Sequence, residues 1–149
     1  MTEPVVIERV FDAPREMVFT FITTRALATQ WWGHDGMSLP EENLDFSRPG
    51  PWFAQLVGAE GGRYKMSGQV TKVVPPSLVA FTWGWHDEND ARGAESHVMI
   101  TLDALDGDRT RLVLRHEDLQ PGPQRDNHSK GWAATLARLE KALAASLSN

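Results

Sequence analysis

The sequence predicts an α+β fold in which a curved antiparallel sheet wraps around one long C-terminal helix, with two short helices after the first strand. Two observations support this prediction. From about residue 50 to residue 117, short strand-like segments alternate with turn residues, so neighbouring strands should pair antiparallel. The segment 124–147 then carries apolar residues at helical spacing. That apolar stripe has to be buried, and the sheet is the only large surface available to it.

The N-terminal part should form one strand and two short helices. Residues 5–11 are rich in Val, Ile and Phe and predict a strand with Ile7, Arg9 and Phe11 on one side. Asp12 or Ala13 is expected to cap the following helix, with Pro14 in its first turn. A second short helix is predicted over residues 25–31.

The middle of the chain predicts the sheet. Residues 37–47 fit an irregular edge strand, because Pro40 cannot donate to a central ladder. Gly68 is a candidate bulge in the following long strand. The last two strands should be joined at Asp106-Gly107, a hairpin turn signal. The further strands are expected at residues 52–57, 63–74, 78–85, 96–102 and 110–116.

The C-terminal helix is predicted from one apolar stripe. Its members recur at steps of three and four and are Trp132, Leu136, Leu139, Leu143 and Leu147. Gly131 lies inside this helix and costs about 1 kcal/mol relative to alanine. We therefore expect Gly131 to mark close packing against the sheet. No internal repeat or linker interrupts the chain, so residues 1–149 are expected to form a single domain.

Composition excludes several classes of partner. The net charge is −5, so nucleic acid and anionic membranes are poor partners, and no apolar run reaches the roughly 20 residues that span a bilayer. The chain has no cysteine, and its N-terminus lacks the features of a signal peptide. These features predict a cytoplasmic protein. No cofactor is predicted, and a homo-oligomer is neither indicated nor excluded.

Several catalytic motifs are missing from the sequence. The five histidines show no metal-ligand spacing, and no glycine-rich loop leads from a strand into a helix. Ser67-Gly68 lies in mid-strand and lacks the GxSxG pattern, which disfavours a hydrolase built on a nucleophile elbow. His97 and His116 would be neighbours if their strands pair. Either each is then a hydrogen-bonded, partly exposed histidine on its strand, or one of them faces the cavity and titrates near neutral pH.

Several segments in register resemble a known family. They are residues 11–19, 30–33, 48–52, 68–70, 75–76, 78–83, 110–116 and 131–132, with Leu136 and Leu139. In this order they resemble the SRPBCC superfamily (START/Bet v 1-like), and within it the AHSA1-like branch named after the activator of Hsp90 ATPase. Pro51 and His34 depart from that branch, which often has glycine and proline there. The resemblance implies a helix-grip fold with an internal cavity between the sheet and the C-terminal helix.

This architecture predicts binding of a small hydrophobic or aromatic molecule in the cavity. Six tryptophans are unusual for 149 residues, and aromatic and thioether side chains can line an apolar site. The residues predicted to line the site are Trp31, Trp32, Trp52, Tyr64, Met66, Phe81, Trp83, Trp85, His97, Met99, Trp132 and Leu136.

Two alternatives remain open from the sequence. The first is a cyclase or aromatase type of enzyme that uses His97, Tyr64 or His34 at the cavity; Glu8, Arg9 and Glu117 are further candidates for proton transfer. The second is an interaction domain similar to the Hsp90 co-chaperone.

Overall fold

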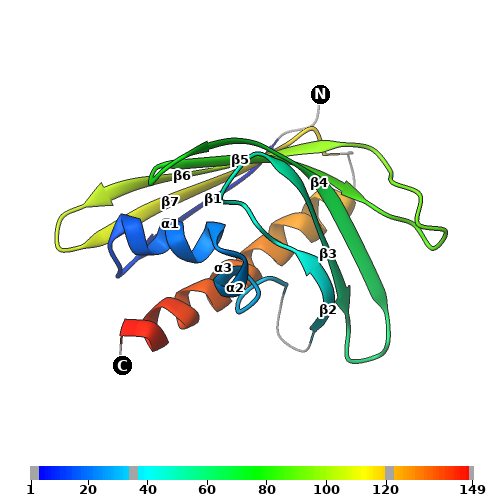
Figure 1. The fold of residues 1–149 in the computed structure, drawn as a ribbon, viewed down its shortest axis with the longest axis horizontal. Helices are drawn as coiled ribbons and strands as arrows, with labels where there is room; N and C mark the ends of the chain where they lie inside the picture. Colours follow the sequence, from blue (N-terminus) through cyan, green and yellow to red (C-terminus); the bar gives the residue numbers. More distant parts are fainter. Residues whose placement is uncertain (1–3, 34–36, 120–122, 148–149) are drawn as a thin grey trace.

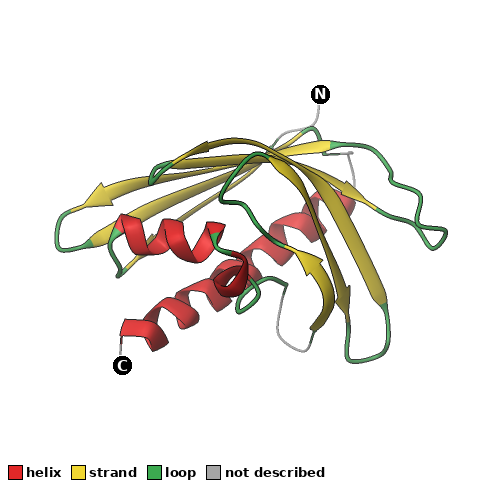
Figure 2. Ribbon diagram, viewed as in Figure 1, coloured by secondary structure: helices red, strands yellow, loops and turns green. Residues whose placement is uncertain are grey.

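The computed structural model describes residues 4–33, 37–119 and 123–147. Within these ranges, seven strands form one antiparallel sheet, and three helices lie on its concave side (Figures 1 and 2). The elements are β1 (Val5–Phe11), α1 (Arg15–Thr23), α2 (Arg25–Ala28), β2 (Ser38–Asn43), β3 (Gly50–Val57), β4 (Arg63–Val74), β5 (Leu78–Trp85), β6 (Ser96–Leu105), β7 (Arg109–Glu117) and α3 (Pro123–Leu147). The predicted helix-grip fold is confirmed.

The strand order is β1-β7-β6-β5-β4-β3-β2, so the first strand pairs with the last. Strand β2 lies at an edge, as Pro40 predicted, and its pairing with β3 shifts in register between Ser38 and Glu41. Strand β1 buries Val5, Ile7 and Phe11 on the concave side, although Arg9 in the same alternation is exposed.

The two short helices differ in detail from the prediction. Helix α1 begins at Arg15 because Pro14 has an extended ψ of 152°, and the Pro14 carbonyl accepts from the N–H groups of Met17 and Val18. Pro14 itself is therefore the N-cap, in place of Asp12 or Ala13. Helix α2 ends at Ala28, three residues earlier than predicted, and the chain turns so that the Trp31 indole is buried and donates to the Phe21 carbonyl at 2.9 Å.

Aromatic rings fill the space between the sheet and the helices. The ring of Trp32 lies 5.7 to 6.0 Å, centroid to centroid, from five other aromatic rings, at the separations that favour tilted and edge-to-face contacts. These rings belong to Trp31, Phe46, Trp52, Trp83 and Trp132.

At Gly68 strand β4 packs closely against β5, and the irregularity in their pairing is not at this glycine as predicted. A Cβ at Gly68 would stand 2.0 Å from the Thr82 carbonyl oxygen on β5. The register shift between β4 and β5 falls between Val70 and Lys72. Glycine is therefore needed at position 68 because the neighbouring backbone occupies the place of a side chain.

Helix α3 crosses the concave side of the sheet diagonally (Figure 1). Four members of its apolar stripe, Trp132, Leu136, Leu139 and Leu143, are at most 5% exposed. Leu147 is 52% exposed, close to the C-terminal end of α3, which in Figure 1 diverges from the sheet.

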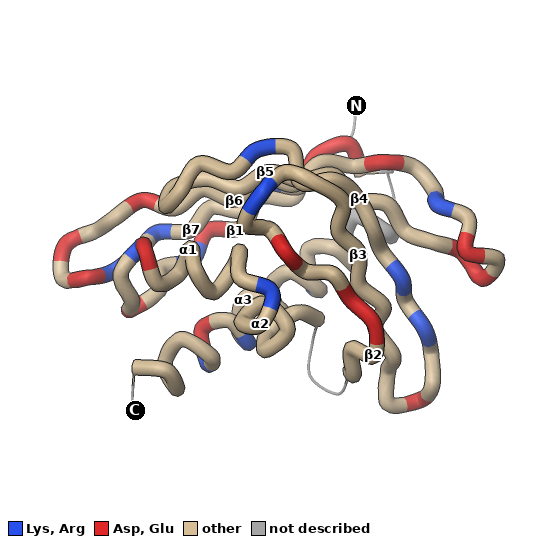
Figure 3. The backbone as a smooth tube through the Cα atoms, viewed as in Figure 1, with Lys and Arg blue, Asp and Glu red and all other residues tan. Residues whose placement is uncertain are grey.

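Charged residues concentrate on strand surfaces and turns. In Figure 3 acidic positions gather at the β6–β7 turn and in the loop after β5, which together hold most of the acidic stretch 87–108. Among the described helices, none is both long enough and apolar enough to cross a membrane.

Candidate functional site

A cavity of about 600 Å³ lies between the first half of α3 and the concave face of β3, β4 and β5. Its side is lined by Trp32, Gly33 and Met37. The lining residues are Trp32, Gly33, Met37, Leu56, Tyr64, Met66, Trp83, Trp85, Asn127, His128, Lys130, Gly131, Trp132 and Thr135.

Gly131 opens this space. A Cβ built at Gly131 would meet no atom outside its own helical turns within 4 Å. The expectation that Gly131 packs closely against the sheet is therefore wrong: the absent side chain leaves room above the helix, and the residue lines the cavity.

Strand alternation supplies the opposite wall. Met66 on β4 pairs directly with Trp85 on β5, and Trp83 follows two positions away on the same face. The indole of Trp83 is 6% exposed, and its Nε1 has no hydrogen-bond partner among the residues that the structure describes.

A buried histidine connects the sheet to the helix beside this wall. Trp132 Nε1 donates to His116 Nδ1 at 3.0 Å, so Nδ1 carries no proton. The neutral ring therefore holds its proton on Nε2, which donates to Ser96 Oγ at 2.7 Å. Ser96 Oγ in turn donates to the Trp83 carbonyl at 3.4 Å. This chain of hydrogen bonds fixes the tautomer of His116 and the position of Trp132.

His128 forms a second indole–imidazole pair in the cavity wall. Trp85 Nε1 donates to His128 Nε2 at 2.9 Å, and the His116 and His128 rings meet edge to face at 4.7 Å. The neutral His128 ring must then carry its proton on Nδ1. Two hydrogen bonds between an indole and an imidazole therefore lie side by side in this wall.

Both histidines are held neutral at physiological pH. Burial, followed by repulsion from His128 and His97, lowers the pKa of His116 to about 3. Burial lowers the pKa of His128 to about 4. The expectation that a histidine facing the cavity titrates near neutrality is therefore wrong for His116, since a desolvated imidazolium is unfavourable there.

His97 and His116 also lie on opposite faces of the sheet. His97 pairs with Glu117, one position out of register with His116, and its side chain is 54% exposed beside Asp118. His116 is fully buried. Side chains one residue apart in register point to opposite sides of a sheet.

The structure brings half of the sequence-predicted site residues together at the cavity. These are Trp32, Tyr64, Met66, Trp83, Trp85 and Trp132, with Tyr64 47% exposed. Trp31, Trp52, Phe81 and Leu136 are buried in the adjoining core and do not line the cavity. His97 and the 42% exposed Met99 lie away from it, as do Glu8, Arg9 and Glu117. His34 lies outside the described residues.

On the helical side of the wall, sequence reasoning found Trp132 and missed His128 and Thr135. His128, Trp132 and Thr135 follow at positions i, i+4 and i+7, which places them on one face of α3. The same spacing was visible in the sequence, but the apolar stripe was traced only from Trp132 onward. Among the described residues, no three His, Asp or Glu side chains are placed to share a metal ion.

Comparison with known proteins supports this architecture. The family described as Activator of Hsp90 ATPase homolog 1-like protein matches residues 12–144. The AHSA1 protein from Silicibacter pomeroyi is 44% identical and superposes with a TM-score of 0.91, covering 96% of this chain and 99% of that chain. No curated protein matches.

More distant structures share the fold. A protein from Chromobacterium violaceum is 19% identical with a TM-score of 0.84, over 95% of this chain and 98% of that chain. A protein from Nitrosomonas europaea is 21% identical with a TM-score of 0.79, over 99% and 97%. With the family match across most of its length and the helix-grip architecture described above, this chain belongs to the Activator of Hsp90 ATPase homolog 1-like family.

Proposed function

We propose that this chain binds one small, neutral, largely apolar or aromatic molecule in the cavity between the sheet and α3. The observation that carries the proposal is a cavity of about 600 Å³ walled mainly by indole, thioether and leucine side chains. Its volume falls in the range of about 300 to 1,000 Å³ typical of small-molecule pockets.

Burial of apolar surface would supply most of the affinity. A ligand that hides about 300 Å² of apolar area gains about 7 kcal/mol before the costs of ordering are subtracted. Micromolar binding is then within reach with few polar contacts.

The polar groups in the wall favour a ligand that accepts a hydrogen bond. His116 uses both ring nitrogens within the protein, so it offers nothing to a ligand. The buried Nε1–H of Trp83 is a donor without an acceptor among the described residues, and a carbonyl or ether oxygen would suit it. The one charged side chain in the lining is Lys130, which is exposed.

The same geometry favours binding over proton-transfer catalysis. A general base works best when its pKa lies near the working pH, whereas the pKa values of His116 and His128 are lowered to about 3 and about 4. Of the residues named for the enzyme alternative that the structure describes, Tyr64 is among the cavity residues and His97 is outside them. The Hsp90 alternative rests on the description of the family.

Native mass spectrometry of freshly purified protein, compared with the denatured protein, tests the proposal. We expect a stoichiometric extra mass that disappears on denaturation, or, for a protein that loses its ligand during purification, saturable binding of the neutral probe N-phenyl-1-naphthylamine. A clean mass together with no probe binding would overturn the proposal.

A further inference from the structure

On the convex face of the sheet, away from the cavity, a serine, a histidine and an aspartate form a continuous hydrogen-bond chain. Ser67 Oγ lies 2.6 Å from His86 Nε2. His86 Nδ1 lies 2.9 Å from Asp90 Oδ1 and 3.2 Å from the Asp90 carbonyl oxygen. Nucleophilic serines in enzymes are activated by an arrangement of this kind, which is recognised by geometry and not by position in the chain.

Strand pairing explains why Ser67 and His86 meet. Ser67 pairs with Gly84, and the His86 N–H donates to the Lys65 carbonyl at 2.9 Å. Ser67 and His86 are therefore diagonal neighbours on one face of β4 and β5. Met66 and Trp85, the residues directly before Ser67 and His86 in the sequence, point to the other face and line the cavity.

A structured turn brings Asp90 over the histidine. The Asp87 carboxylate accepts from the N–H groups of Asn89 and Ala91, and Asp90 has a left-handed φ of 63°. Lys65 Nζ contacts Asp90 Oδ1 at 3.0 Å, and its hydrogen bond holds the pKa of Asp90 below the usual value. Asp90 is therefore an ionised acceptor.

These contacts assign the protons. A carboxylate and a carbonyl beside Nδ1 require Nδ1 to carry the ring proton when His86 is neutral. The lone pair of Nε2 then accepts from the Ser67 hydroxyl. This is the tautomer in which a histidine can take the proton of a serine.

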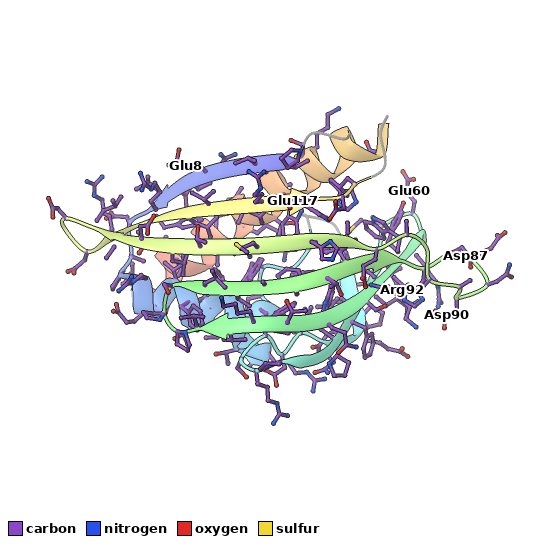
Figure 4. The ribbon with its side chains drawn as sticks, turned by 90° about the horizontal axis from the view of Figure 1, so that it is seen from above. Glu8, Glu60, Asp87, Asp90, Arg92 and Glu117 are labelled. Carbon is purple, nitrogen blue, oxygen red and sulfur yellow. The ribbon has the colours of Figure 1, made fainter. Side chains whose placement is uncertain are left out.

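A cation lies next to the serine. Arg92 Nη2 donates to the Ser67 carbonyl at 3.1 Å, and Arg92 Nη1 pairs with Glu95 at 3.2 Å. A Cβ at Gly84, opposite Ser67, would stand 2.5 Å from the guanidinium, so the glycine makes room for this cation. In Figure 4 Asp87, Asp90 and Arg92 lie together at one end of the sheet, where the loop after β5 folds back.

We propose that Ser67 is a nucleophile that takes an acyl group from small activated carboxylic esters. Ser67 Oγ bonds to the ester carbonyl carbon as His86 Nε2 takes its proton. The carbon–oxygen bond to the alcohol breaks, and His86 returns the proton to the departing oxygen. Water, activated by His86, then cleaves the acyl-serine to a carboxylic acid.

The Arg92 guanidinium supplies positive charge near the carbonyl oxygen as it becomes negative. Ser67 and His86 are the catalytic residues, and Asp90 is a positioning residue.

Reaction with 4-nitrophenyl acetate tests this proposal in the intact protein. We expect release of nitrophenol and, in protein quenched with acid during turnover to trap the acyl-serine, a gain in mass of one acetyl group, assigned to Ser67 by peptide mapping of the wild-type chain. Mapping does not depend on whether any variant folds. Acetylation confined to lysines and the N-terminus would overturn the proposal.

Two matched pairs of variants assign the roles. Ser67→Ala should abolish the site-specific acetylation, whereas Ser47→Ala should not, because Ser47 contacts the Asp45 carboxylate without a histidine. His86→Gln should slow nitrophenol release by about a hundredfold. His97→Gln should leave it unchanged, because the hydrogen bond of His97 joins it to the Asp118 carboxylate and not to a serine. Equal effects of His86→Gln and His97→Gln would contradict the assignment.

The role of Asp90 has a spectroscopic readout that a general loss of structure would not reproduce. The ring-nitrogen NMR shifts of His86 should report the Nδ1–H tautomer in the wild type and a shift toward the Nε2–H tautomer in Asp90→Asn, with the sheet resonances unchanged. An unchanged tautomer in Asp90→Asn would refute the positioning role.

Discussion

Trp132 on α3 donates a hydrogen bond from its indole Nε1 to His116 Nδ1 on β7, and both residues are at least 95% buried. This contact joins the helix to the sheet beside the cavity. It also sets the tautomer of His116, whose other nitrogen is bonded to Ser96. This polar pair in an aromatic core therefore holds α3 against β7 beside the cavity.

Replacement of Trp132 by phenylalanine should destabilise the protein. The variant leaves the buried His116 Nδ1 without its donor, which costs about 1–3 kcal/mol. Urea unfolding at neutral pH measures this loss. Trp85→Phe is the matched control: it removes the corresponding hydrogen bond to His128, and it should cost less stability because Trp85 is only partly buried. An unchanged free energy of unfolding for Trp132→Phe would show that the bond contributes nothing to stability.

Stability should fall as the pH is lowered from about 6.5 to about 4. The folded-state pKa values of His116 and His128 are lowered from 6.5 to about 3 and about 4, so the unfolded chain binds more protons than the folded one in this window. The free energy of unfolding therefore rises with pH there, by a few kcal/mol in total, and levels off above about pH 6.5.

Urea unfolding across this pH range, in the wild type and in His128→Gln, checks the assignment. The glutamine can still accept from Trp85 but does not titrate. In His128→Gln, the free energy of unfolding should change less steeply with pH, because one titrating group no longer contributes. An identical slope in the two proteins would mean that His128 does not take part.

The sequence predicted the elements that follow a simple periodicity. The stripe Trp132, Leu136, Leu139 and Leu143 is buried as expected, because each step of three or four residues returns to the same face of a helix. The strand predicted over residues 78–85 is also present, and its alternate residues Val79, Phe81 and Trp83 share a buried face.

Contacts between distant segments could not be predicted in this way. His116 on β7 and His128 on α3 meet because of the position of α3 against the sheet. The spacing of residues along the sequence contains no information about that position. A glycine inside a helix can border either a close contact or an open space, and only the position of the sheet decides between them, so the prediction of close packing for Gly131 was wrong. The mid-strand position of Ser67 argues against a nucleophile elbow. The sequence does not show that its partner is His86, a diagonal neighbour on the next strand.

Gly68→Ala should be strongly destabilising. The new methyl group would fall 2.0 Å from the Thr82 carbonyl oxygen, and a strand backbone cannot move aside cheaply. We expect a loss of about 3 kcal/mol or more. Gly84→Ala on the neighbouring strand is the matched control, since only the flexible end of Arg92 stands in its way. Thermal unfolding of both variants compares them, and similar losses would contradict the account.

The cavity itself is tested most directly at Gly131. Alanine at this position should raise the free energy of unfolding by about 1 kcal/mol and leave binding intact, because the methyl group meets open space and alanine favours the helix. Gly131→Phe should place a ring in the same space. Titration of N-phenyl-1-naphthylamine into the wild type and both variants is the decisive measurement. The account predicts saturable binding to the wild type and to Gly131→Ala, and its loss in a folded Gly131→Phe. Equal binding by all three proteins would show that the cavity between the sheet and α3 is not the binding site.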